Sequence, residues 1–393
     1  MKARWRTVRV DEIADVLGGR QLSSPRATGA LRPYLRVANV LDGTIDVSDV
    51  KSMRMTDAEF ETFRLRAGDV LLNEGQSLEL VGRTAVYRDE PHECAFQNSL
   101  IRLRARAGVD EEFLEYLMRY QYASRQFARI SARTTSIAHL GLGRVSALRV
   151  RVPDISMQRI IARLLGSTTA RVETLKQLRA AKQVLVRGLM RELLAGSRLE
   201  ARRSHVKRSS VRLGDAFDER DETGWEQLPL LAITGDRGVI LRSELSRRDS
   251  SAQDKAGYKR IAPGDIGYNT MRMWQGVSGL SEIEGIVSPA YTVVTPKRDV
   301  ILPSFAAHLL KYPPVIHEFL RLSQGLVEDT LNLKFPVFAQ VRVELPAIPV
   351  QREIASVLDT ATREIRVLAE TEKTLHAQRR GLMDHFLGGE ENG

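Results

Sequence analysis

A fifteen-residue phrase occurs twice in this chain, and it constrains the fold more than any other feature of the sequence. Residues 152–166 read VPDISMQRIIARLLG, and residues 345–359 read LPAIPVQREIASVLD. Gln158 and Gln351 hold the same place in the two copies, 193 positions apart in a chain of 393 residues. The alignment continues without a gap to the endings RGLMRELLAG and RGLMDHFLGG. We infer that the chain is an internal duplication.

Each copy of the phrase predicts the start of one long helix. Proline precedes the helix, where its missing N–H costs nothing, and glycine follows the last apolar residue. Between these ends, apolar residues recur at steps of three and four, which gives a stripe suited to pairing with another helix. A helix of about 37 residues, at about 1.5 Å per residue, is about 55 Å long. Such a length is typical of a spacer.

Length and composition set the broad class of protein. A chain of 393 residues is longer than a single hydrophobic core usually accommodates, which predicts at least two domains. Hydrophobic residues at 43% and charged residues at 27% are typical of globular proteins. The one cysteine, Cys94, excludes a disulfide framework and a multi-thiolate zinc site. The basic start lacks a following apolar run, so we expect no signal peptide. No apolar stretch approaches about 20 residues, so we expect no membrane span and a cytoplasmic location.

The charge balance points toward a polyanionic partner. The formal net charge is +10. Excess Lys and Arg favours nucleic acid, because each phosphate contact releases a condensed counterion. An arginine-rich solvated surface is the alternative that charge alone leaves open.

The segments that precede the two helices share a weaker order of features. FRLRAGDVLLNEG at 63–75 resembles YKRIAPGDIGYNTMR at 258–272, and DEEFLEYLMRY at 110–120 resembles LPSFAAHLLKY at 302–312. Alternating strand-like runs close both segments, so we expect two compact α+β domains rich in strands. The polar, basic stretch at 196–210 predicts a linker.

This order of features resembles the specificity (S) subunit of type I restriction-modification systems, an antiphage defence. The phrase that opens both helices, in which Gln stands five positions after Pro, carries the resemblance, together with the Gly-Asp turn. The family's usual Glu before the Gln is replaced by Met157 and Val350, and the second domain lacks a counterpart of Trp5.

The resemblance implies an α+β fold with two target recognition domains and a pair of long antiparallel coiled-coil helices, related by a pseudo-two-fold internal repeat. The implied domains are residues 1–152 for target recognition domain 1, 153–196 for spacer helix 1, 197–209 for the linker, 210–345 for target recognition domain 2, and 346–389 for spacer helix 2. Each domain would read one half of a bipartite double-stranded DNA site. Two methyltransferase (M) subunits would dock on the helices, and restriction/translocase (R) subunits could join them. The chain itself would bind no cofactor, and S-adenosylmethionine is expected on the methyltransferase.

Motifs for catalysis are missing from the sequence. The nearest match to a methyltransferase Pro-Pro-aromatic loop is SPAY at 288–291, which lacks the polar first residue and the second proline. A phosphate-binding Gly-Lys-Ser/Thr sequence is absent, and the seven histidines show no zinc-ligand spacing. We therefore expect a non-catalytic chain without a metal site.

Two loops, here called the recognition loops, are the best candidates for contact with DNA bases. Arg and Lys suit guanine, Asn and Gln suit adenine, and exposed loops can vary without disturbing the scaffold. In the first domain the recognition loop spans residues 73–84, and residues 131–136 add a segment suited to phosphate. The candidates there are Asn73, Gln76, Ser77, Arg83, Arg133, Thr134 and Thr135.

The second recognition loop, residues 267–279, interleaves aromatic and amide residues with arginine. Arg237 on a tight turn and Lys334 before a Phe-Pro pair are further candidates. The full set in this domain is Arg237, Tyr268, Asn269, Thr270, Arg272, Trp274, Gln275 and Lys334.

The residues at the helix starts have a different predicted role. Gln158, Arg159, Gln351 and Arg352 are expected to join each domain to its helix or to contact a partner subunit. For the whole chain, the alternative hypothesis is a stand-alone bipartite DNA-binding scaffold or regulator that has no methyltransferase partner.

Overall fold

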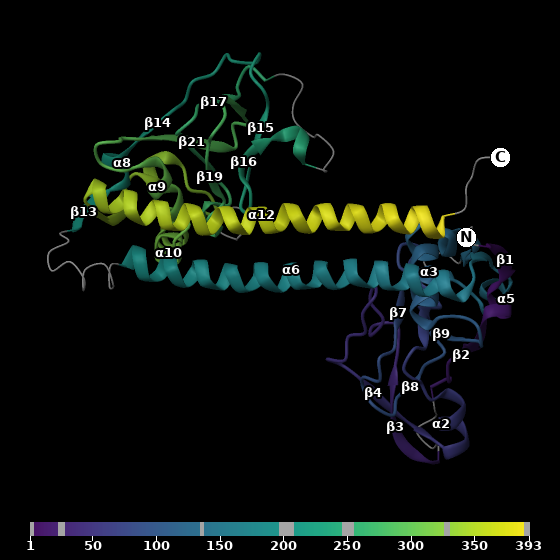
Figure 1. Cartoon of the computed structure of the whole chain (residues 1–393). Helices are drawn as coiled ribbons and strands as arrows, with labels where there is room; N and C mark the ends of the chain where they lie inside the picture. Colours follow the sequence, from purple (N-terminus) through teal and green to yellow (C-terminus); the bar gives the residue numbers. More distant parts are fainter. Residues whose placement is uncertain are drawn as a thin grey trace. The chain divides into compact units, whose positions relative to one another are not determined.

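The computed structural model describes residues 4–22, 28–133, 137–195, 208–245, 255–325 and 331–388, with the side chain of Arg133 left undescribed. Two compact units divide the chain (Figure 1). Unit 1 comprises Met1–Leu175 and Thr371–Gly393, and unit 2 comprises Lys176–Glu370. Each unit therefore combines a strand-rich part with portions of both long helices.

The central element of unit 1 is an antiparallel sheet in the order β2-β9-β5-β7. Its strands are β2 (Ala14–Gly18), β9 (Leu100–Ala105), β5 (Val70–Asn73) and β7 (Thr84–Val86). Leu72, Ile101 and Leu103 point into a core that also contains Phe113 and Leu117 of helix α3 (Glu111–Ala123). Asp110 caps this helix, since its carboxylate accepts the Phe113 N–H at 3.0 Å.

Unit 2 repeats this arrangement with a different set of side chains. Its central sheet has the order β14-β21-β18-β19, so each strand has a counterpart at the same place in unit 1. The strands are β14 (Phe217–Glu219), β21 (Tyr291–Pro296), β18 (Ile266–Asn269) and β19 (Ser278–Leu280). Helices α9 (Pro303–Leu309) and α10 (Pro313–Leu322) pack on the core through Phe305, Leu309 and Phe319.

Smaller strand groups surround the two central sheets. In unit 1 these are β1 (Arg6–Arg9) with β12 (Arg149–Val152), β4 (Lys51–Met55) with β3 (Ala30–Leu35) and β8 (Ala95–Phe96), and β10 (Ala132–Arg133) with β11 (Ala138–His139) and β6 (Gly75–Gln76). In unit 2 they are β13 (Arg208–Arg212) with β22 (Arg342–Pro346), β15 (Leu231–Thr234) with β16 (Gly238–Leu241), and β17 (Lys259–Ile261) with β20 (Gly285–Val287). Short helices complete the two units: α1 (Val10–Ile13), α2 (Asp57–Phe63), α4 (Gln126–Ile130), α5 (Leu142–Ala147), α8 (Leu213–Ala216), η1 (Arg242–Glu244), η2 (Met273–Gln275) and α11 (Phe335–Phe338).

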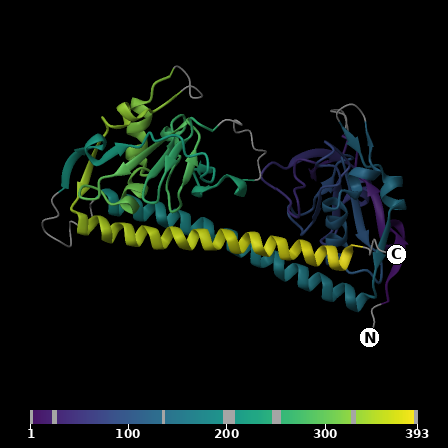
Figure 2. The same ribbon diagram turned by 90° about the horizontal axis from the view of Figure 1, so that it is seen from above.

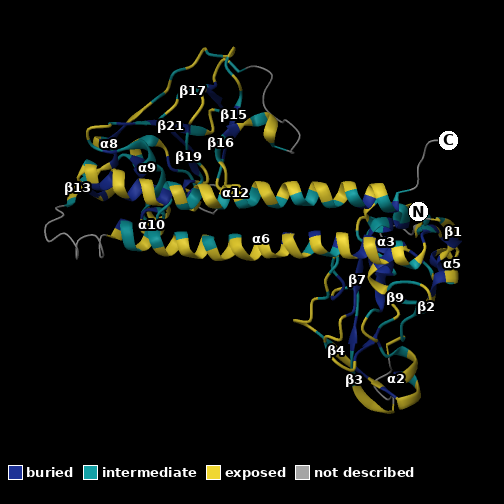
Figure 3. Cartoon of the chain, in the orientation of Figure 1, coloured by how far each residue is buried: buried dark blue, intermediate teal, exposed yellow. Residues whose placement is uncertain are grey.

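The two predicted long helices are present as α6 (Ile155–Ala195, 41 residues) and α12 (Ile348–Leu387, 40 residues). Asp154 caps α6 by accepting the Met157 N–H at 3.0 Å. Buried and exposed positions alternate along both helices at helical spacing (Figure 3).

Within each unit the start of one long helix packs with the end of the other. In unit 1, Ile161 and Leu165 of α6 share a core with Met383 and Leu387 of α12. In unit 2, the beginning of α12 shares a core with Leu194 of α6, and the two segments lie side by side in Figures 1 and 2. The two helices therefore run in opposite directions in each unit. The predicted α+β fold with an antiparallel helix pair and an internal repeat is confirmed.

Candidate nucleic-acid interface

A buried carboxylate fixes the strand that leads into each recognition loop. Gly68 and Gly264 have φ of +92° and +96°, which favours glycine, and each precedes an aspartate that is at most 2% exposed. Asp69 accepts the Arg66 N–H at 2.8 Å and both Nε and Nη2 of Arg104 at 2.7 Å.

Asp265 holds the equivalent place in unit 2 with a partly different set of partners. Its carboxylate accepts the Ala262 N–H at 2.8 Å, the Arg220 Nε–H at 2.7 Å and the Thr295 hydroxyl at 2.8 Å. The sequence signalled this pair through the repeated Gly-Asp turn, but only the structure shows the arginine partners. The strands β5 and β18 are thus anchored directly before the candidate residues.

The structure brings together the two candidate segments of unit 1. Strand β6 pairs with β11, which in turn pairs with β10, so that Gln76 lies opposite Ala138. A further bond, from the Leu140 N–H to the Glu74 carbonyl at 2.8 Å, closes the base of this small sheet. Residues 73–84 and 131–133 therefore form one surface rather than two separate loops.

The tip of the unit 1 recognition loop is a tight turn packed on helices. Amides of Leu80 and Val81 donate to the Ser77 carbonyl at 3.0 and 2.9 Å, and the Tyr122 hydroxyl donates to the Glu79 carbonyl at 3.0 Å. Gln76, Ser77 and Arg83 are half-buried, which leaves part of each side chain accessible.

Not every candidate of unit 1 reaches the surface. Asn73 is 0% exposed, so the prediction that this side chain contacts DNA is wrong for the folded unit. Its amide group lies beneath the loop, and neither Oδ1 nor Nδ2 has a hydrogen-bond partner within the described residues. Thr134, Thr135 and the side chain of Arg133 lie outside the described residues, so their predicted phosphate contacts stay predictions.

The recognition loop of unit 2 combines local order with exposed side chains. Asn269 Oδ1 accepts the Met271 N–H at 3.0 Å, and the Trp274 indole donates to the Met271 carbonyl at 3.0 Å. These bonds shape the turn from the inside, because Asn269 and Trp274 are half-buried. Arg272 and Gln275 are exposed on its outer side. Thr270 is half-buried, with its hydroxyl 3.2 Å from that of Thr292.

Tyr268 is a core residue. It is 0% exposed and stacks on Phe338 at 5.2 Å between ring centroids, while burial raises the pKa of its hydroxyl. The prediction that Tyr268 contacts DNA is therefore wrong. The strand alternation places its neighbour Asn269 on the opposite, more accessible side.

Two further candidates lie beside the unit 2 loop. The Leu333 N–H donates to the Thr270 carbonyl at 2.8 Å, which holds the exposed Lys334 next to the loop. This bond is the counterpart of the Leu140–Glu74 bond in unit 1. Arg237 is exposed on the β15–β16 turn, where it forms an ion pair with Glu244. That hairpin packs on β19, since a Cβ added to Gly279 would lie 2.6 Å from the Cα of Gly238.

The two repeated glutamines make the same set of hydrogen bonds in both units. Gln158 accepts the Asp110 N–H at 2.9 Å and donates to the carbonyls of Gly108 at 3.4 Å and Pro153 at 2.9 Å. Gln351 accepts the Leu302 N–H and donates to the carbonyls of Val300 and Pro346, all at 2.9 Å.

Each of these glutamines ties the start of a long helix to the segment before α3 or α9. Both are 1% exposed, and they therefore act inside their own units. The exposed Arg159 and Arg352 beside them remain candidates for contact with a partner, and the Arg159 Nε is 4.0 Å from the Asp110 carboxylate.

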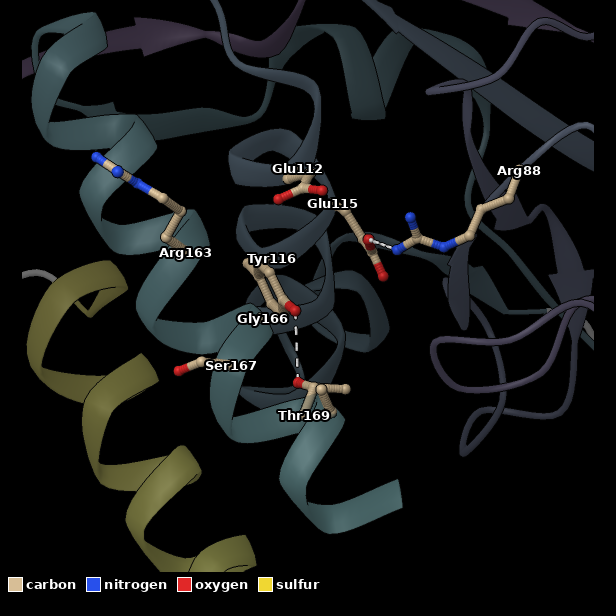
Figure 4. A pocket seen from close by; sticks show the side chains of 9 residues that line it. Arg88, Glu112, Glu115, Tyr116, Arg163, Gly166, Ser167 and Thr169 are labelled. Atoms are coloured by element: carbon tan, nitrogen blue, oxygen red, sulfur yellow. Dashed lines mark hydrogen bonds and ion pairs between the residues drawn. The ribbon is translucent and has the colours of Figure 1, made fainter. Parts of the chain in front are cut away.

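A hollow of about 440 Å³ lies between α3 and the beginning of α6 in unit 1 (Figure 4). Burial raises the pKa of Glu115 at its edge, against the opposing effect of Arg119 and Arg88. The Tyr116 hydroxyl donates to Thr169 Oγ1 at 3.4 Å. Charged groups that pair with one another in this way are typical of a structural network rather than of acid–base catalysis.

The described residues also bear on metal binding and on membrane insertion. No cluster of three or more His, Cys, Asp or Glu side chains suited to a metal ion occurs among them. Within the same residues, no helix is both long and apolar enough to cross a membrane.

Comparison with known proteins agrees with the geometry. The family model described as the type I restriction modification DNA specificity domain matches residues 2–181. The match covers 180 of the 393 residues, so this part of the chain is similar to the specificity domain of type I restriction-modification systems. The resemblance inferred from the repeated Pro and Gln phrase is thus confirmed.

Two curated relatives share low sequence identity with this chain. The putative type I restriction enzyme MjaX specificity subunit of Methanocaldococcus jannaschii is 20% identical over 191 residues, which are 48% of this chain and 45% of that protein. The type I restriction enzyme EcoKI specificity subunit of Escherichia coli K12 is 24% identical over 159 residues, 39% of this chain and 34% of the relative. The matched segments thus span less than half the length of either relative.

Solved structures extend the similarity of fold to almost the whole chain. The crystal structure of a type I restriction-modification S subunit from M. genitalium matches with a TM-score of 0.63 at 16% identity, covering 98% of this chain and 96% of that one. A chain from a structure on complex assembly and conformational transition of the type I restriction-modification system matches with a TM-score of 0.56 at 18% identity, covering 98% of both. At these identities the matches establish the fold.

Proposed function

We propose that this chain is the non-catalytic DNA-recognition subunit of a type I restriction-modification complex. The observation that carries the proposal is the duplicated central sheet, which presents a recognition loop at the same sheet position in both units. In unit 2 that loop exposes Arg272 and Gln275 and has Lys334 beside it. Arginine and glutamine are the side chains that pair with guanine and adenine in the major groove, and lysine suits phosphate.

The target is a bipartite double-stranded DNA site, with one half-site for each unit. This part of the proposal is supported by the internal repeat, because two copies of one reader suit two half-sites. Methyltransferase subunits dock on the long helices, restriction/translocase subunits join that complex, and S-adenosylmethionine binds to the methyltransferase. Exposed apolar side chains along α6, such as Ile160 at 49% and Leu185 at 57%, support docking of protein on this helix. The complex acts on DNA in the cytoplasm.

The decisive experiment compares Arg272→Ala and Gln275→Ala with wild type in cells that also express the methyltransferase subunits. Methylome sequencing of the wild type reports both half-sites and their spacing. Each variant should relax the sequence requirement in one half-site only, since a direct base contact contributes about 1–3 kcal/mol of discrimination. Arg342→Ala, at an exposed arginine on β22, is the matched control and should leave the motif unchanged.

The possible outcomes separate the parts of the proposal. Methylation that is unchanged in both loop variants would show that the loop assignment is wrong. DNA binding that is weakened equally for all sequences, with a salt dependence that corresponds to about one phosphate contact fewer, would assign Arg272 to the DNA backbone. Wild-type chain that binds DNA without supporting any methylation would favour the stand-alone scaffold.

A further inference from the structure

A basic residue near the end of the helix that packs on each central sheet occupies the same position in both units. Arg119 stands in the sequence Leu-Met-Arg-Tyr and Lys311 in Leu-Leu-Lys-Tyr, each followed directly by Tyr120 or Tyr312. Neither residue belongs to a recognition loop. The structure nevertheless places both beside the turn of a short hairpin, residues 40–45 in unit 1 and 233–239 in unit 2, here called the tip hairpins.

In unit 1 the guanidinium of Arg119 packs closely against the turn of the tip hairpin. The Arg119 side chain is 9% exposed, and its Nη2 is 3.4 Å from Asp42 Oδ1. A Cβ added to Gly43 would lie 2.6 Å from Arg119 Cζ, and Gly43 has a φ of +76°. The turn therefore needs glycine both for its backbone conformation and for the close approach of the arginine.

The same tip hairpin is bonded to the recognition loop on its other side. The Gly43 N–H donates to the Thr84 carbonyl at 2.8 Å, and Arg83 Nε donates to the Val40 carbonyl at 2.8 Å. Arg83 and Thr84 are the last residues of the recognition loop of unit 1. The hairpin is thus held between that loop and Arg119.

Unit 2 contains the same arrangement with lysine in place of arginine. Lys311 Nζ donates to the Gly235 carbonyl at 3.2 Å, at the turn of the tip hairpin. Burial lowers the pKa of Lys311, opposed by the nearby Asp236. An added Cβ on Gly235 would lie 3.7 Å from Val277 Cγ2, in the recognition loop. Lys311, the hairpin turn and the recognition loop therefore form one contact cluster, as in unit 1.

The cluster in each unit also faces a cation of α12. Burial lowers the pKa of Arg379, and Arg119 lowers it further, while Asp42 raises it. Arg366 has the same pKa-lowering effect on Lys311 in unit 2. The tip hairpin is thus electrostatically linked to the long helix on one side and bonded to the recognition loop on the other.

We propose that Arg119 and Lys311 are positioning residues for DNA recognition, each holding the tip hairpin that supports the recognition loop of its own unit. This inference rests on the proposed function. Because each cation acts within one unit, its removal impairs discrimination in one half-site and leaves the other half-site unchanged. Neither side chain contacts DNA itself.

The test uses Arg119→Met and Lys311→Met in the complex with methyltransferase subunits. The probes are duplexes carrying the motif that methylome sequencing of the wild-type complex reports, with single-base changes in either half. Each Met variant should lose about 10-fold in discrimination in one half-site, toward the low end of what one base contact contributes. The two variants should affect opposite half-sites.

Rescue and a matched control separate positioning from simple stabilisation. Arg119→Lys and Lys311→Arg keep the cation and should retain discrimination. Lys259→Met removes another lysine of unit 2, which is 16% exposed and forms its ion pairs with Asp221 at 2.8 Å and Glu219 at 3.9 Å rather than with the tip hairpin. It should leave discrimination intact even where it lowers the melting temperature.

Hydrogen exchange on the chain alone gives a readout that does not depend on DNA. Peptides covering residues 40–45 should exchange about 10-fold faster in Arg119→Met, and those covering 233–239 in Lys311→Met, because each loses a charge-assisted contact. Faster exchange with unchanged discrimination in both half-sites would overturn the inference while leaving the proposed function standing. A wild-type complex that does not discriminate between the duplexes would instead overturn the proposed function.

Discussion

Replacing Gln351 by Met should destabilise unit 2 by about 3 kcal/mol while leaving unit 1 unaffected. Methionine has nearly the shape of glutamine but cannot make the bonds to the Leu302 N–H and to the carbonyls of Val300 and Pro346. A net contribution of about 1 kcal/mol for each of these bonds gives the total, and buried groups left without a partner raise it further. Domains of this kind have about 5–15 kcal/mol of stability, so the variant should still fold.

The assay combines urea unfolding with hydrogen exchange followed by mass spectrometry. Exchange resolves the two units, which denaturant unfolding alone does not guarantee in a chain with two compact units. Peptides containing the Leu302 amide should exchange up to about 100-fold faster, whereas peptides containing Asp110 should be unchanged. Gln158→Met should give the reverse pattern, because Gln158 accepts the Asp110 N–H in unit 1.

Arg352→Met is the matched control, since it changes the adjacent, exposed residue. It should alter the free energy of unfolding by less than about 0.5 kcal/mol. A loss below that same value in Gln351→Met, together with unchanged exchange at Leu302, would refute the conclusion that the repeated glutamine joins helix and domain.

Asp265→Asn should lower the stability of unit 2 by about 3–5 kcal/mol, because Arg220 and Thr295 would lose a buried carboxylate partner. Equal melting temperatures of variant and wild type would contradict this. Cys94 is 0% exposed and burial raises the pKa of its thiol to about 12, so iodoacetamide at pH 8 should label it only as fast as the chain unfolds. The folded state keeps the thiol proton that the unfolded state releases above the ordinary thiol pKa of 9.0. The free energy of unfolding should therefore fall as the pH rises from 9 toward 12, and a Cys94→Ser chain should lose less stability over that range. Lys182 forms an ion pair with Glu364, whose side chain is 54% exposed, so Lys182→Met should change stability by less than about 1 kcal/mol. A larger loss measured in 0.5 M salt would argue against a screened surface pair.

The exposed and the buried candidates for DNA contact show how far the sequence alone could predict the site. Each candidate loop follows a Gly-Asp turn and its strand, and Arg272, Gln275 and Lys334 are exposed, while their predicted contacts with DNA stay predictions. The prediction failed for Tyr268 because a strand turns alternate side chains to opposite faces, and for Asn73 because all four residues of β5 are buried. Which faces are covered depends on elements far away in sequence. Tyr268 meets Phe338, seventy residues later in the chain.

The sequence by itself determined the architecture of this protein. A phrase repeated at a spacing of 193 residues, with helical periodicity and proline and glycine at its ends, is a local pattern that predicts two long helices and two similar domains. Only the tertiary structure decided what the repeated polar residues do. Hydrogen bonds from Gln351 to Val300, from Arg104 to Asp69 and from Lys311 to Gly235 join residues that are 51, 35 and 76 positions apart. Their partners are backbone carbonyls and buried carboxylates, which come within reach only after the sheets and helices have packed.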